Sequence, residues 1–401
     1  MRFALITLGV FVCFGIFSNF LASSSPIYCT YKGKSYFPAF QEKIMIDGVL
    51  QSSEQQNWRE LDLESVIWPL IPYGKGIDMD HRTISPFGEQ KTYSGESIPM
   101  RERHWLGTGR NGLDILAVII RGSRRALSVG IFTMLLAGII GILFGSFAGY
   151  FQDHKLLLKR ASLYLLIPAF ILGGFYAFYV RRFNFQTAEG AASLIWETCL
   201  SLLIFGLFIV AFFQLGKRMY WGKYLQERIP LKLDSFISRF MELIQSLPPL
   251  LLILSLAAFF DSQNIWFVML IIALVSWMGI ARVVRGEMMS VSEREFIQAG
   301  KALGLKPLQI LFRHVLPNSL ASVWPMLAFG LGSAILAEAT LSFLALIEDS
   351  QNSWGGMLTE GKLVRQHWWI ALFPGISIFL CVFAFNIIGE KLRDFLDPKS
   401  Q

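Results

Sequence analysis

The chain consists of long, uninterrupted apolar runs separated by short polar stretches that are mostly basic. Eight of these runs are long enough to cross about 30 Å of hydrocarbon as helices that rise about 1.5 Å per residue. They cover residues 3–22, 126–150, 161–180, 193–215, 236–260, 264–284, 319–345 and 369–389. The pattern predicts an all-α integral membrane protein with about eight transmembrane helices.

Composition supports this prediction and narrows the function classes. Of the 401 residues, 54% are hydrophobic and 16% are charged, whereas ordinary soluble domains are about 25% charged. This excludes a disordered chain and argues against a cytosolic enzyme. The net charge of +7 fits the basic loops of a membrane protein better than a nucleic-acid-binding surface, so we expect membrane lipid and no nucleic acid as a partner.

The first run has two interpretations. Arg2 precedes an apolar stretch that ends in Leu21-Ala22-Ser23-Ser24, which is the pattern of a secretory signal. The uncharged stretch is long for a signal. We therefore favour an uncleaved transmembrane anchor over residues 1–22.

The Lys and Arg residues of the short loops predict the orientation. Most of them lie in 151–160, 216–235, 285–318 and the tail after 389, and cytoplasmic loops carry an excess of these residues. Both termini are then cytoplasmic, and segment 23–125 lies outside, leading into the membrane core. One feature opposes this orientation, because Arg121, Arg124 and Arg125 would sit at the outer mouth of the second span.

A helix–turn–helix pattern occupies the cytoplasmic loop 292–317. Ser292 and Glu295 have the spacing of a capping box, which predicts a helix start near residue 293. Gly304 is a natural helix stop, and Pro307 suits the first turn of a second helix. Pro317 is expected to end that helix before the next span.

The first of these helices has small residues on one side and apolar residues elsewhere. The small residues are Ala299, Gly300 and Ala302, and the apolar ones are Phe296, Ile297 and Leu303. Small residues allow another backbone to approach closely. We interpret the element as a docking site that transmits motion between a soluble partner and the spans, and the alternative is an amphipathic helix lying on the lipid surface.

This stretch resembles the EAA loop of permease subunits of binding-protein-dependent ABC importers, in the oligopeptide/dipeptide branch. The resemblance rests on Gln298-Ala299-Gly300, on Gly304 and on the run 312–318. The family usually has glutamate at 298 and alanine at 300. The resemblance implies that 292–317 couples to an ATPase. The implied coupling residues are Phe296, Gln298, Ala299, Gly300, Leu303, Gly304, Arg313, Leu316 and Pro317.

Further stretches carry the same resemblance over about 104–153 and 234–398. Run 104–114 is similar to the motif at the start of the family's core, but Gly109 stands where aspartate is usual and Leu113 where arginine is usual. The other matching stretches are 239–242 with Pro248, 338–344, 353–358, 369–375 and the run from Asn386 to 394–398. Tyr36-Phe37-Pro38 is similar to the extended outer loop of microcin C-type peptide permeases.

The resemblance implies a type I ABC importer permease fold with six family helices. The core would cover 126–398, with 23–125 as a periplasmic segment. Residues 154–233 depart from the family, which joins these spans by a short turn, so we expect an inserted transmembrane hairpin there. The hairpin is expected to lie against lipid, and a regulatory or partner-binding role is the alternative.

The implied function is the ATP-driven import of peptides or peptide-like substrates across the bacterial inner membrane by alternating access. The implied partners are a second permease subunit, two ABC ATPase subunits and a periplasmic or lipid-anchored binding protein. ATP and Mg would be used by the ATPases. Residues 32–35 match the end of a phosphate-binding loop, but Tyr28 stands where the first glycine of that motif is required. We expect no catalytic residue, cofactor or metal on this chain. Oligopeptides, dipeptides, peptide antibiotics and metal chelates all stay open as substrates.

Three residues are candidates for a pathway or gate. Glu338 is an acid within an apolar run, which indicates function or a side chain that reaches the interface. Pro248 should kink the 236–260 helix, and Asn386 makes a packing or a pathway contact. Gly141, Gly145 and Gly149 have the spacing of closely packed membrane helices.

Two rival functions belong to other classes. A secondary transporter driven by an ion gradient would need ionisable residues near mid-span and often has internal repeats. A membrane enzyme would need a clustered catalytic constellation in the spans.

Overall fold

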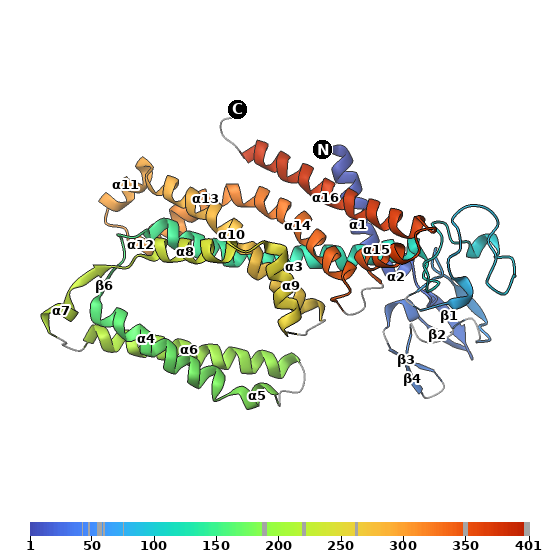
Figure 1. Cartoon of the computed structure of the whole chain (residues 1–401), viewed down its shortest axis with the longest axis horizontal. Coiled ribbons are helices and arrows are strands. Elements are labelled where there is room, and N and C mark those ends of the chain that lie inside the picture. Colours follow the sequence, from blue (N-terminus) through green and yellow to red (C-terminus); the bar gives the residue numbers. More distant parts are fainter. Residues whose placement is uncertain are drawn as a thin grey trace. The chain divides into compact units, whose positions relative to one another are not determined.

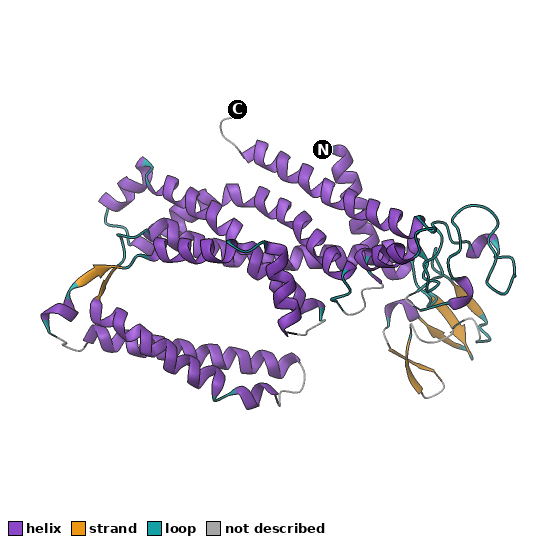
Figure 2. Ribbon diagram, viewed as in Figure 1, coloured by secondary structure: helices purple, strands orange, loops and turns teal. Residues whose placement is uncertain are grey.

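The computed structural model describes residues 1–41, 43–46, 49–53, 58, 61–74, 76–186, 191–218, 222–260, 264–347 and 352–396. The end of the predicted core, 397–398, lies outside these described residues. The chain forms two compact units, one made of 1–146 with 241–401 and the other of 147–240. The second unit encloses the predicted insertion 154–233. Figures 1 and 2 show the helices that make up most of both units.

Six helices of the described chain are long and apolar enough to cross a membrane. They are Ile115–Phe151, Arg160–Asn184, Trp196–Arg218, Ile265–Ser292, Pro307–Phe343 and Trp369–Leu396. A seventh span is possible as a bent pair, α8 (Leu233–Gln245) with α9 (Pro249–Phe260).

The predicted count of eight is not confirmed, because the first apolar run is broken. It forms α1 (Arg2–Ile16) and the short α2 (Ser18–Leu21). With 15 residues, α1 reaches about 22 Å, which is less than the hydrocarbon thickness of about 30 Å.

The long helices of the larger unit pack against one another through clusters of buried apolar side chains. These helices are α3 (Ile115–Phe151), α10 (Ile265–Ser292), α14 (Val323–Phe343) and α16 (Trp369–Leu396), and α15 (Trp354–Leu363) packs on α14 and α16. A cluster of buried side chains includes Phe11 of α1, Leu127 of α3, Ile335 of α14 and Phe385 of α16. Helix α1 therefore belongs to the same packed bundle, although it is short.

Two glycines of the predicted packing repeat allow α3 to touch α10. A Cβ atom at Gly141 would lie 2.8 Å from the carbonyl oxygen of Trp277, and one at Gly145 would lie 2.5 Å from that of Ala281. Neither position has room for a side chain. The interpretation of Gly141 and Gly145 as structural residues is therefore confirmed.

The smaller unit is a helical hairpin. Its helices α4 (Arg160–Gly174) and α6 (Ala191–Arg218) pack against each other (Figure 1). A π-turn (Phe175–Tyr179) and α5 (Arg182–Gln186) follow α4. Strands β6 (Leu157–Lys159) and β7 (Arg228–Pro230) pair at its base, and α7 (Lys223–Gln226) precedes β7. Arg181 and Glu197 form an ion pair within it.

The segment before α3 contains short antiparallel strands, so helices account for the spans and not for the whole chain. β1 (Tyr28–Tyr31) lies between β2 (Lys34–Tyr36) and β5 (Ser65–Ile67), and β3 (Lys43–Ile46) pairs with β4 (Val49–Ser52). Cys29, Ile44 and Trp58 form its small buried core. Three short 3-10 turns complete it, at Pro38–Phe40, Met79–His81 and Met100–Glu102.

Helix α3 begins at Ile115, earlier than the predicted span, and it contains the arginines that opposed the charge rule. Arg124 donates from Nε to the Gly15 carbonyl at 2.9 Å and from Nη2 to the Ile16 carbonyl at 3.3 Å. It therefore binds the carbonyl groups that end α1. Arg125 forms an ion pair with Glu338. These contacts give both arginines a structural role.

Candidate functional site

The predicted helix–turn–helix is present in loop 292–317. Helix α11 (Glu295–Ala302) ends in a Schellman motif, in which the Leu305 N–H donates to the Gly300 carbonyl at 3.2 Å and the Gly304 N–H to the Lys301 carbonyl at 3.0 Å. Gly304 has a φ of +77°, a left-handed conformation that favours glycine. Helix α12 (Pro307–Ile310) begins at its proline. The predicted roles of Gly304 and Pro307 are thus confirmed.

The predicted start and end of this motif are wrong. Ser292 is the last residue of α10, and its hydroxyl donates to the Met288 carbonyl at 2.6 Å instead of capping α11. Pro317 does not end the second helix, because a π-turn (Leu311–Val315), α13 (Leu316–Ser319) and a 3-10 turn (Leu320–Ser322) lead directly into α14. Pro317 lies in the first turn of α13, where its missing N–H costs little.

Most of the predicted coupling residues are exposed. Phe296, Gln298, Ala299, Leu303, Gly304, Arg313 and Pro317 are exposed, and Gly300 and Leu316 are half-buried. Phe296 is 46% exposed and Leu303 82%, whereas Ile297 is only 1% exposed. Ile297 therefore anchors α11 to its own chain. Phe296 and Leu303 present apolar surface to the outside, which is unusual unless another molecule covers it.

Gln298 joins the elbow, which is formed by α11, the turn at Gly304 and α12, to α10. Its amide nitrogen donates to the Ser292 carbonyl at 3.3 Å, and its amide oxygen accepts from Lys301 Nζ at 3.3 Å. An amide can both donate and accept, whereas an ionised glutamate can only accept. The glutamine at this position can therefore make a bond to α10 that a glutamate could not.

A cavity of about 750 Å³ lies between α3, α8, α9, α10 and α14. Its walls are mostly apolar, and the polar side chains among the described lining residues are Gln245, Ser276, Arg282, Ser333 and Thr340. The sequence reasoning missed this set. Such positions carry no local signal, because they share a wall only through the packing of helices distant in sequence.

The three candidate gate residues differ in their relation to this cavity. Pro248 lies in the break between α8 and α9, which are bent by 82°, so the predicted kink is confirmed. Its neighbours Leu247 and Pro249 line the cavity. Asn386 lies beside Gly332, where a Cβ atom would be 3.7 Å from its Oδ1. Asn386 and Glu338 are not among the described lining residues.

Glu338 is buried, with 2% of the residue exposed. Its Oε1 accepts from Arg125 Nε at 3.1 Å and from the Ser342 hydroxyl at 2.8 Å. The alternative that Glu338 reaches the membrane interface is therefore wrong. The pair joins α14 to α3.

The motif at the start of the core, residues 104–114, is bound to the first turn of α3 by hydrogen bonds. Asp114 accepts the Ala117 N–H at 2.7 Å, as an N-cap residue does. Its other oxygen lies 2.8 Å from Nδ1 of the fully buried His104, and His104 Nε2 lies 3.0 Å from His81 Nδ1. These hydrogen bonds hold the segment before α3 against the first turn of that helix.

Gly109, where the family usually has aspartate, makes room for Glu360. A Cβ atom at Gly109 would lie 2.7 Å from Glu360 Oε2, which accepts the Arg110 N–H at 3.1 Å. Asn111 donates to the other carboxylate oxygen at 3.2 Å. Burial raises the pKa of the Glu360 carboxyl, and the Arg110 N–H opposes that rise.

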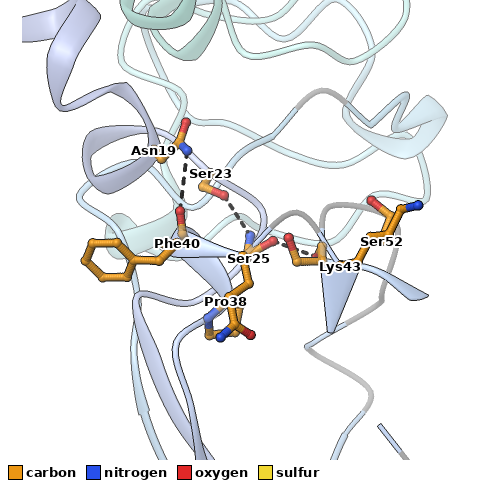
Figure 3. A pocket seen from close by; sticks show the side chains of 10 residues that line it. Asn19, Ser23, Ser25, Pro38, Phe40, Lys43 and Ser52 are labelled. Carbon is orange, nitrogen blue, oxygen red and sulfur yellow. Dashed lines mark hydrogen bonds between the residues drawn. The ribbon is translucent and has the colours of Figure 1, made fainter. Parts of the chain in front are cut away.

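A second, smaller cavity of about 390 Å³ lies in the strand-containing segment (Figure 3). Its serines bind within the chain, since Ser23 Oγ accepts the Ser25 N–H at 3.0 Å and the Ser25 hydroxyl donates to the Ser53 carbonyl at 2.7 Å. Asn19 donates to the Ala39 carbonyl at 3.4 Å. The Asn19 bond connects α2 to the 3-10 turn Pro38–Phe40, so these contacts give the side chains of Asn19, Ser23 and Ser25 a structural role.

Comparisons with known proteins match residues 219–401 to a family and most of the chain to dipeptide permease relatives. Residues 219–401 match the family described as binding-protein-dependent transport system inner membrane component. The chain is 30% identical to the dipeptide transport system permease protein DppC of Alkalihalophilus pseudofirmus over 319 residues, which is 79% of each chain.

The oligopeptide transport system permease proteins OppC match over a shorter region of 172 residues. Identity is 36% to the protein of Haemophilus influenzae and 38% to that of Salmonella typhimurium, in each case over 42% of this chain. The matched region spans 55% and 57% of those two relatives.

Proposed function

Because the chain belongs to the family of binding-protein-dependent transport system inner membrane components, we propose that it is the permease subunit of an ATP-driven importer of peptides or peptide-like substrates. The substrate class is that named for the DppC and OppC relatives. Such a subunit would expose its pathway alternately to the two sides of the inner membrane and would make or break no covalent bond.

One observation carries this proposal, namely the direct connection between the exposed elbow and the walls of the larger cavity. Helix α10 ends at Ser292, shortly before α11, and a continuous helical segment runs from Pro307 through α14 to Phe343. Both α10 and α14 line the cavity. A force applied at Gly304 would therefore act on two cavity walls.

The partners follow from the same proposal. An ABC ATPase would cover Phe296 and Leu303, the apolar side chains exposed on the elbow, and would use ATP and Mg. A second permease subunit would complete the pathway, and a binding protein would deliver substrate to the strand-containing segment. The elbow and both termini would be cytoplasmic, and the strand-containing segment periplasmic.

The inserted hairpin is proposed to lie against lipid. Only 17% and 11% of the residues in the apolar windows of its two helices are buried within the chain. Apolar residues exposed over such lengths favour a lipid environment.

Reconstitution distinguishes ATP-driven import from the rival secondary transport. Proteoliposomes would contain this chain with its second permease, the ATPases and the binding protein, and accumulation of labelled peptide would be followed. We expect accumulation with ATP and none with an ion gradient alone. Accumulation driven by an ion gradient in liposomes that contain this chain alone would contradict the proposal.

A further inference from the structure

The larger cavity contains one charged side chain among its described lining residues, Arg282 of α10. It lies ten residues before the end of α10 at Ser292, or about 15 Å from that end. The surrounding lining is mainly apolar, with Met, Leu, Ile and Phe side chains from five helices. A guanidinium is ionised at any physiological pH. It therefore places a fixed positive charge at this cavity.

The partner that the structure gives Arg282 is neutral. Its Nη2 donates to the side-chain oxygen of Gln245, the last residue of α8. Within the described residues, no carboxylate is recorded at salt-bridge distance from it. The contrast with other arginines is clear, because Arg125 lies against Glu338 and Arg181 against Glu197.

This arrangement favours an anionic ligand. The Arg282 residue is exposed at this cavity, so its charge is accessible to a ligand, and the planar guanidinium matches a carboxylate with two parallel hydrogen bonds. A volume of about 750 Å³ is within the range of about 300–1,000 Å³ found for ligand sites.

We propose that Arg282 binds the C-terminal carboxylate of a peptide in transit, while the apolar walls contact the peptide's side chains. The proposal rests on the proposed import function and deepens it, because it names the chemical group that the cavity recognises. Gln245 orients the guanidinium. Since Gln245 ends α8 just before the break at Pro248, it ties the carboxylate subsite to the bend of 82° between α8 and α9.

The test compares three peptides of one apolar sequence in the reconstituted importer. One has a free C-terminal carboxylate, one is amidated, and one is amidated but carries a glutamate side chain. The carboxylate could belong to the peptide's C-terminus or to a side chain, and the third peptide distinguishes these two possibilities. We expect wild type to take up the free acid about tenfold faster than either amide, the size expected for one charge-assisted hydrogen bond.

Two substitutions should reduce this preference by different routes. Arg282→Gln removes the charge. Gln245→Glu supplies an internal carboxylate that occupies Arg282, so it should also lower the ratio of free-acid to amide uptake relative to wild type. Gly286→Ala on the same helix, where a Cβ atom meets nothing within 4 Å, is the matched control. All variants use the same binding protein, so its own selectivity cancels in the comparison.

The outcomes separate the two proposals. If Arg282→Gln and Gln245→Glu keep the wild-type ratio while importing peptide, the carboxylate subsite is wrong and the import function stands. A glutamate-bearing amide taken up as fast as the free acid would overturn the assignment to the C-terminus. Failure of wild type to import any peptide with ATP would instead contradict the proposed function. Should Arg282→Gln not accumulate in the membrane, Gln245→Glu alone decides.

Discussion

The guanidinium of Arg125 on α3 and the carboxylate of Glu338 on α14 lie 3.1 Å apart, and each side chain is largely buried. The two residues are 213 positions apart in sequence. Their contact joins the helix that begins the core to the helix that leaves the elbow. Both charges can remain inside an apolar bundle because each neutralises the other.

Removing one partner should be more harmful than removing both. Glu338→Leu or Arg125→Met leaves a buried charge without its counterion, and we expect each to cost about 3–5 kcal/mol of stability. The double variant Arg125→Met with Glu338→Leu should regain most of that loss. Thermal unfolding of the purified protein in detergent measures all three. If the double variant loses as much stability as the two single variants together, the two residues do not stabilise the fold as a pair.

The close approach of α3 to α10 predicts that alanine substitutions at two glycines differ in their effect on stability. Gly145→Ala would place a Cβ atom 2.5 Å from the Ala281 carbonyl and force the backbones apart, at a cost of about 1–3 kcal/mol. Gly286→Ala has open space and should be neutral or slightly stabilising, since alanine is the better helix former. Melting temperatures of both variants check this, and equal values would show that the contact is not tight.

Glu360 predicts a pH dependence of stability. Burial raises the pKa of its carboxyl in the folded protein, so the folded state binds the proton more tightly than the unfolded chain. This contribution to the free energy of unfolding is fully present below the ordinary glutamate pKa of about 4.3. It is lost as the pH rises through the raised pKa of the folded state.

Glu360→Gln should flatten this part of the stability profile, because the amide cannot ionise but still accepts the Arg110 N–H. Unfolding midpoints measured from about pH 4 to 7 test the prediction. Glu390→Gln, at an exposed position near the end of α16, controls for the loss of a charge. A Glu360→Gln profile as steep as that of wild type would contradict it.

Substitutions in the elbow are expected to abolish transport while the protein still folds. Gly300→Leu should be tolerated by this chain, because a Cβ atom there meets only the Leu305 side chain at 3.4 Å, yet it should abolish uptake by blocking a partner. Gly304→Pro should also abolish it, because proline cannot adopt a φ of +77°.

Membrane levels and protease resistance measure folding in these two variants, and co-purification measures ATPase binding. Gly300→Leu should be inserted normally but retain less ATPase. Normal uptake by both variants would count against a coupling role for the elbow.

Local features of this protein follow from the sequence alone. Gly304 and Pro307 mark the turn, Pro248 marks the break between α8 and α9, and the apolar runs mark the spans. Each depends on the conformational limits of one residue or on the polarity of a continuous segment, so no distant contact is needed to recognise it. The same local reasoning misplaced Ser292 and Pro317, because a hydroxyl can bond its own helix and the first turn of a helix tolerates a proline.

Tertiary structure alone decides which of these elements meet. It gives Glu338 its partner Arg125, brings Gln245 to Arg282 and sets Gly109 against Glu360. It also shows that the first apolar run is divided into α1 and α2. Such contacts depend on the rotation and approach of helices far apart in sequence, and the polarity of a segment constrains neither. The sequence by itself therefore determined that this is a membrane-embedded helical protein with an exposed elbow, and the packing decided where its charges and its cavity lie.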